Sequence, residues 1–183
     1  MHTNCRFLQV DDINNEEEAV RWSINAAVQR GNVYCSGSGR EQFRDEWEKE
    51  LRRESQRYRD LATALSDSEH CKIIGGIADR LSSRFAPLLN GGRLRFGTSQ
   101  KAFNLYLKYL WHFAEITEPP HCPFDAVVLG RKLNIYDAWT QSDDENAYMR
   151  WVNAARKKAG TVSIPEWECA AWLCGRGTTG NLV

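Results

Sequence analysis

A stripe of polar side chains in an otherwise apolar segment is the feature of this sequence with the most scope for chemistry. Beyond its first two residues, the segment 99–116 is predominantly apolar, and the polar exceptions are Lys101, Asn104, Lys108, His112 and Glu115. Since these positions are three or four residues apart, they would share one face of a helix. That face either meets water or lines a cleft, and a cleft would let its lysines act as nucleophiles.

The lysines on this face can act as nucleophiles only in a suitable environment. An amine is a nucleophile only after it loses its proton, which a desolvated site or a neighbouring cation favours. Lys101 is the first candidate for this role. Lys108 lies about two turns further along the same face, where it could be the neighbouring cation or the nucleophile itself. The alternative for both lysines is a solvated amine at the end of a long side chain that leaves a buried helix.

The segments on either side of this helix carry charges that would suit a nucleic-acid substrate. Arg93 and Arg95 precede the helix, and Gly97 and Thr98 open it. A helix start with free amides and basic neighbours can hold a phosphate. Further along, Asp125 lies at or near the start of another short helix, where its carboxylate could cap that helix or work as a base.

The residues 97–102, Gly-Thr-Ser-Gln-Lys-Ala, and 123–128, Pro-Phe-Asp-Ala-Val-Val, resemble the helix-hairpin-helix DNA glycosylase superfamily. In that superfamily a hairpin glycine precedes a lysine by four residues, and the following helix leads to a Pro-x-Asp-x-x-Val segment. The resemblance covers residues 93–133. Ser99 replaces the second hairpin glycine, Arg95-Phe96 replaces a Leu-Pro pair, and the loop from lysine to aspartate is longer than usual.

This resemblance implies an all-helical fold and a base flipped out of the DNA into a pocket. Lys101 would be the Schiff-base nucleophile that attacks the sugar carbon as the base leaves, and Asp125 would stabilise the developing charge or activate the amine. No cofactor is implied. The residues expected to contact nucleic acid are Arg93, Arg95, Gly97, Thr98, Asn104 and Arg131.

The charge balance favours a rival interpretation as well. Lys and Arg together number 24, and so do Asp and Glu, so no global field attracts nucleic acid. The rival is a non-enzymatic helical module, in which the charged helix 39–65 or the Trp-rich C-terminal helices dock a protein partner or a second copy of the chain.

The cysteines and the hydropathy pattern predict a reduced, cytoplasmic protein. The six cysteines are scattered without a Cys-x-x-Cys pair, so we expect free thiols and no metal site. No apolar run is long enough to cross a membrane, and residues 1–12 lack the pattern of a secretory signal.

Helix-start signals and the chain length predict a single all-α domain of about seven helices over residues 1–183, with 175–183 as a flexible tail. The resemblance implies that the centre of this domain is similar to a helix-hairpin-helix. A serine with a glutamate three residues later, the capping-box pattern, occurs at Ser38, Ser66, Ser142 and Ser163. An earlier helix begins near residue 14 or 15 and stops at 31. The other expected helices are 39–65, 68–89, 99–116, 125–133 and two amphipathic helices at the C-terminal end.

Overall fold

The computed structural model describes residues 12–29, 31–35, 37–59 and 65–175, with side chains up to residue 172. The α-helices are α2 (Glu16–Val28), α3 (Arg40–Ser55), α4 (Asp67–Phe85), α5 (Phe96–His112), α6 (Glu145–Ala159) and α7 (Ile164–Gly175). Within these described ranges, the only strand-like pairing is an isolated bridge between Tyr34 and Leu89. The all-α prediction is therefore confirmed. The predictions for residues 1–11 and for the tail beyond 175 fall outside the described residues.

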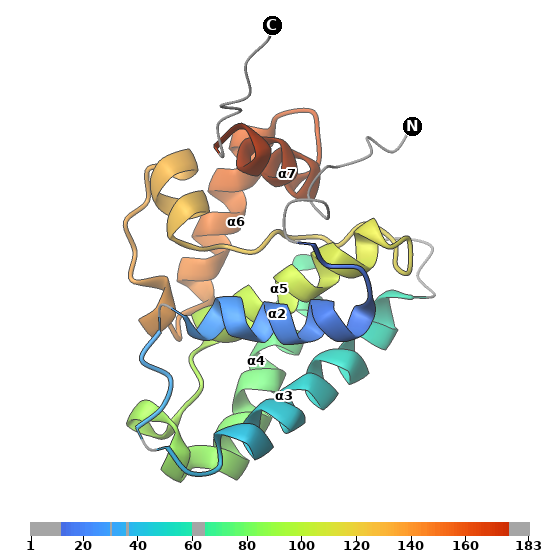
Figure 1. The fold of residues 1–183 in the computed structure, drawn as a ribbon. Coiled ribbons are helices and arrows are strands. Elements are labelled where there is room, and N and C mark those ends of the chain that lie inside the picture. Colours follow the sequence, from blue (N-terminus) through green and yellow to red (C-terminus); the bar gives the residue numbers. More distant parts are fainter. Residues whose placement is uncertain (1–11, 30, 36, 60–64, 176–183) are drawn as a thin grey trace, which may run out of the picture.

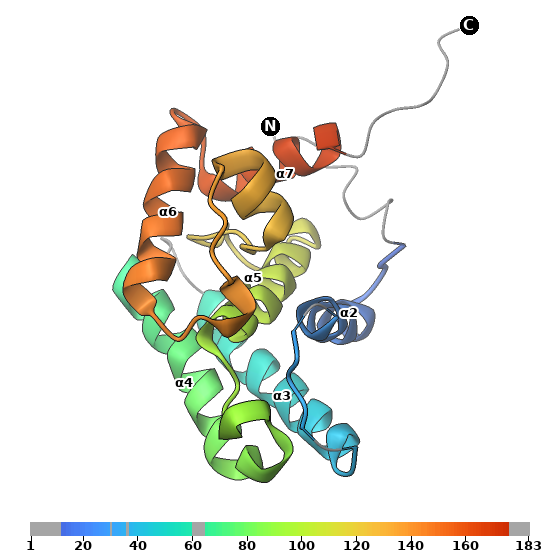
Figure 2. The same cartoon turned by 90° about the vertical axis from the view of Figure 1, so that its left-hand side faces the viewer.

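Helix α5 runs through the middle of the molecule. In Figure 1, α3 and α4 lie on one side of it, α6 and α7 lie on the other, and α2 crosses it. Figure 2, turned by 90°, shows the same arrangement. Every residue from Phe96 to Leu110 is buried. Over that length Asn104 and Lys108 of the polar stripe are shielded from water by the elements that pack against α5, and only the Lys101 side chain keeps some exposure, at 10%.

Two of the four predicted capping boxes are present. The Ser66 hydroxyl accepts a hydrogen bond from the Glu69 amide, and the Glu69 carboxylate accepts one from the Ser66 amide. Ser163 and Glu166 form the same reciprocal pair at the start of α7. Each box satisfies two backbone donors that the first turn of a helix leaves without an internal partner.

The other two predicted boxes are wrong. Helix α3 is capped by Gly39, with φ at +84°, so Ser38 lies outside the helix. Helix α6 begins three residues after Ser142, with Asp144 as its cap. The Ser142 carbonyl instead accepts a hydrogen bond from the Gly97 amide, which draws this residue toward α5. A tertiary contact has therefore moved the start of α6.

Three predicted helices differ in length or type. Helix α3 ends at Ser55 in a 3-10 turn, Gln56–Tyr58, and the rest of the predicted helix includes residues 60–64, which are not described. Helix α4 gives way at its end to a 3-10 turn, Ala86–Leu88, that contains Pro87, which cannot donate a helical hydrogen bond. The expected helix 125–133 is a π-helix, Val127–Leu133, a type that occurs frequently at functional sites.

Candidate active site

Lys101 and Asp125 meet at the junction of α5 and the π-helix. The Lys101 Nζ lies 2.7 Å from the Asp125 Oδ2. Asp125 Oδ1 accepts hydrogen bonds from the amides of Val127 and Val128 at 2.9 and 3.1 Å, so the carboxylate also caps the π-helix. The two side chains are 10% and 23% exposed, which places the pair at the edge of the core.

The surroundings keep the carboxylate ionised. Burial raises the pKa of Asp125, but the Lys101 ammonium and the two backbone amides outweigh burial, so the pKa is lowered overall. An ionised carboxylate beside an ammonium can accept its proton when the amine reacts. The geometry thus places the Lys101 amine within hydrogen-bond distance of a carboxylate that could receive its proton.

Two amide side chains of α5 hold the loop that carries Asp125. Gln100 donates to the Phe124 carbonyl at 2.6 Å and accepts from the Phe124 amide at 3.2 Å. Asn104 donates to the Cys122 carbonyl at 3.1 Å and is fully buried. Asn104 is therefore not in a position to contact nucleic acid, contrary to the sequence-based expectation. The role of Gln100 was not predicted, because a glutamine in a first helical turn carries no distinctive signal.

Lys108 is sealed in the core between α5 and α7. Its Nζ lies 2.6 Å from the Glu168 Oε2, both side chains are 3% exposed, and the Trp172 ring lies 5.6 Å from the amine. Burial lowers the pKa of Lys108, but Glu168 outweighs burial and raises it overall. A buried, ionised lysine cannot reach a macromolecular substrate. Lys108 as an alternative nucleophile is therefore contradicted by its burial.

The two predicted phosphate-binding arginines are held by an aspartate of the chain itself. The Asp143 carboxylate lies 3.1 Å from the Arg93 Nε and 2.5 Å from the Arg95 Nη1. A carboxylate thus occupies a position between these two guanidinium groups where we expected a phosphate. Asp143 lies 48 residues after Arg95, and its role was not visible in the sequence.

The amides at the start of α5 are also engaged. The Phe96 amide donates to the Asp143 carboxylate at 3.0 Å, and the Gly97 amide donates to the Ser142 carbonyl at 2.9 Å. The expectation that Gly97 offers a free amide to phosphate is therefore corrected, because the segment before α6 caps this helix start.

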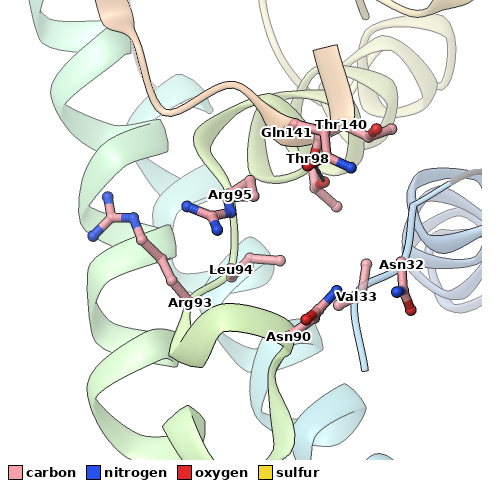
Figure 3. A pocket seen from close by; sticks show the side chains of 9 residues that line it. All are labelled: Asn32, Val33, Asn90, Arg93, Leu94, Arg95, Thr98, Thr140 and Gln141. Atoms are coloured by element: carbon pink, nitrogen blue, oxygen red, sulfur yellow. Dashed lines mark hydrogen bonds between the residues drawn. The ribbon is translucent and has the colours of Figure 1, made fainter. Parts of the chain in front are cut away.

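A cavity of about 190 Å³ lies beside the start of α5 (Figure 3). Arg93, Arg95 and Thr98, three of the residues expected to contact nucleic acid, line it. Lys101 and Asp125 are not among its lining residues, so the amine–carboxylate pair and the arginines do not share one hollow. Arg131 lies apart from the cavity lining as well, exposed on the π-helix.

A chain of hydrogen bonds runs through the core on the other side of Asn104. In order, it joins Tyr58, His70, Asn104, Tyr148, His121 and Asp67, with donor–acceptor distances of 2.7, 2.7, 3.0, 2.8 and 3.0 Å. Because the Asn104 amide nitrogen also donates to a backbone carbonyl, its oxygen faces His70 and accepts from the ring. Each remaining donor then points in the same direction, toward the Asp67 carboxylate.

The last three members have the connectivity of a catalytic triad, carboxylate to histidine to hydroxyl. Tyr148 is nevertheless 0% exposed, and burial raises the pKa of its hydroxyl well above the ordinary value. A hydroxyl with no access to substrate cannot act as a nucleophile. This chain therefore contributes structure, since it satisfies polar groups that would otherwise be buried without partners.

Two buried histidines, His70 and His121, and the half-buried His112 should make the protein sensitive to acid. Burial lowers the pKa of His70 and His121, and lowers that of His112 to about 4. Unfolded histidine titrates near pH ~6.5, so below that pH the unfolded chain binds protons that the native protein does not. We expect full stability above pH ~6.5 and a loss of about 1.4 kcal/mol per pH unit for each such histidine below it. Asp67, whose pKa is lowered mainly by its hydrogen bond with His121, adds a loss only below pH ~4.

Urea unfolding followed by circular dichroism between about pH 5 and pH 8 measures this slope. The variant His112→Gln removes one titrating group and should reduce the slope by about one proton. A free energy of unfolding that stays constant over this range would contradict the prediction.

Comparison with protein-family models, with curated proteins and with solved structures found no match for this chain. In the part of the chain that the structure describes, no helix is both long and apolar enough to cross a membrane. The same part holds no group of three or more His, Cys, Asp or Glu side chains arranged to bind a metal ion. The function must accordingly be inferred from the geometry of the residues described above.

Proposed function

We propose that the protein processes damaged DNA as a base-excision glycosylase/lyase in which Lys101 is the nucleophile. The observation that supports this most directly is the 2.7 Å contact between the Lys101 amine and the Asp125 carboxylate. The two residues come from separate segments, and they are the lysine and aspartate that the resemblance pairs. DNA as the substrate rests on the resemblance of residues 93–133.

Accessibility favours Lys101 over the other lysine of the stripe. The Lys101 pair retains 10% and 23% exposure, whereas the Lys108 pair retains 3% on each side. The Lys101 amine therefore lies nearer to solvent than the Lys108 amine. Reaching Lys108 would require α7 to leave α5.

The reaction follows from the chemistry of this pair. Asp125 takes a proton from the Lys101 ammonium. On an intact nucleotide the neutral amine displaces the base from C1′, the base takes the proton from Asp125, and the C1′–O4′ bond then breaks as a proton moves from nitrogen to O4′, which gives an iminium. At an abasic site the amine adds to the C1′ aldehyde, and loss of water, assisted by the proton on Asp125, gives the same iminium. The resulting iminium acidifies the neighbouring C2′–H bond, so loss of that proton expels the 3′ phosphate. Water then hydrolyses the imine and restores Lys101.

Borohydride trapping tests the proposal. With an oligonucleotide that contains an abasic site, reduction should leave a covalent adduct, and peptide mass spectrometry should place it on Lys101. Lys101→Ala should abolish the adduct, while Lys49→Ala, at an exposed lysine of α3, should leave it unchanged. Asp125→Asn can still cap the π-helix and should slow adduct formation by roughly 100-fold.

Two results would overturn this function. An adduct that persists undiminished in Lys101→Ala would assign the chemistry to another amine. No adduct on any abasic or damaged substrate, together with no salt-dependent DNA binding, would favour the non-enzymatic interaction module instead.

A further inference from the structure

The cavity beside the start of α5 is a separate feature from the Lys101–Asp125 pair. Three stretches of chain enclose it: the connection after α2, the segment that leads into α5 with its first turn, and the segment before α6 (Figure 3). Its volume is about 190 Å³, which corresponds to roughly six water molecules at ~30 Å³ each. Sites for drug-sized ligands are larger, at ~300 Å³ or more. The part of a ligand that enters this cavity must therefore be small.

The lining offers hydrogen-bond donors and no carboxylate. None of the nine described residues that line the cavity is acidic, and only Val33 and Leu94 are apolar. The donors include the side-chain amides of Asn32, Asn90 and Gln141. A small cavity rich in donors and free of carboxylates suits an anion.

Arg95 supplies the positive charge. Its single ion pair among the described residues is with Asp143, through Nη1, and Asp143 is not among the lining residues. Since a guanidinium carries five N–H groups, this pair fixes one edge of Arg95 and leaves other N–H groups for a ligand. Figure 3 shows Arg93 pointing away from the other lining side chains, toward α4, where it pairs with Asp79. Of the two arginines, Arg95 thus lies nearer to the other lining side chains.

We infer that this cavity binds a small free oxyanion with phosphate chemistry, either inorganic phosphate or the phosphate group of a monoester. The cavity size favours a compact ion, and the fork of Arg95 with the surrounding amides matches tetrahedral oxygens. The site shares no residue with the Lys101–Asp125 pair, so loss of phosphate binding and loss of the borohydride adduct are separate outcomes.

Nuclear magnetic resonance of the full chain tests this inference. Sodium phosphate, added at constant ionic strength against sodium chloride, should give saturable shifts of the amides of residues 90–98 and 140–141. Arg95→Gln should weaken the apparent affinity at least ~10-fold. The matched control Arg150→Gln, at an exposed arginine of α6, should bind as the unchanged protein does.

A second variant and a second ligand distinguish a specific phosphate site from a general salt effect. Gln141→Ala changes an exposed lining residue, so it should fold normally and bind phosphate more weakly. Dimethyl phosphate, a diester, should bind more weakly than phosphate, and equal binding would point to a nucleic-acid backbone instead. Absent saturation, or equal affinities in Arg95→Gln and Arg150→Gln, would show only a general salt effect and overturn the site.

Discussion

Gly97→Ala should destabilise the protein by about 3 kcal/mol, or prevent folding. A Cβ at this position would lie 1.7 Å from the Trp139 carbonyl oxygen, which belongs to the backbone and cannot turn away. Relieving this clash moves the segment before α6 and breaks the hydrogen bond from the Gly97 amide to the Ser142 carbonyl. Overpacking costs up to ~3 kcal/mol and a lost hydrogen bond ~1 kcal/mol. The better helix propensity of alanine returns at most ~1 kcal/mol.

Gly75→Ala in α4 is the matched control. There the new Cβ would meet only the Phe96 ring, at 3.8 Å, an ordinary van der Waals contact. This variant should be neutral or up to ~1 kcal/mol more stable. Chemical denaturation of both variants measures the difference. If Gly97→Ala were as stable as Gly75→Ala, the close approach of the segment before α6 to α5 would be wrong.

Glu168→Ala should cost about 3–5 kcal/mol, since it leaves the buried Lys108 ammonium without its carboxylate. In its absence the pKa of Lys108 should fall, because burial would then act without the opposing charge. Thermal and urea unfolding of the variant measure the loss of stability. The loss should become smaller at high pH, where the amine can deprotonate.

Two comparison variants distinguish the cost of an unpaired buried charge from the cost of shortening the Glu168 side chain. The double variant Lys108→Met, Glu168→Leu removes both charges and should recover most of the stability. Lys49→Ala, which removes a pair with Glu46 in which the lysine is 73% exposed, should cost less than ~1 kcal/mol. Equal losses in Glu168→Ala and the double variant would show that packing, rather than an uncompensated charge, controls stability at this site.

The helices were predictable because their signals are local. The apolar pattern of α5, the Asn15 cap of α2 and the Ser163 box of α7 each depend on residues within a few positions of one another. The capping boxes predicted at Ser38 and Ser142 are absent for the same physical reason. Residues close in sequence can form a capping box on their own, but the box forms only where tertiary contacts permit the helix to begin at that residue.

The polar partners were much less predictable, because they come from distant parts of the chain. His70 bonds to Asn104 from 34 residues away, and Lys108 pairs with Glu168 from 60 residues away. A polar residue on an apolar helix is ordinarily assigned to water, so their burial went unpredicted. The structure does bring Lys101 and Asp125 together, a proximity that the resemblance suggested and that spacing alone could not supply.

The central place of α5 also bears on how the chain folds during synthesis. Its packing partners lie both earlier in the sequence, in α2 and α4, and later, where Glu168 meets Lys108. A ribosome delivers these partners at different times, so one flank of this apolar helix stays uncovered until α7 has emerged. Until then the nascent chain exposes part of its most apolar helix, which is the condition that favours aggregation of incomplete chains.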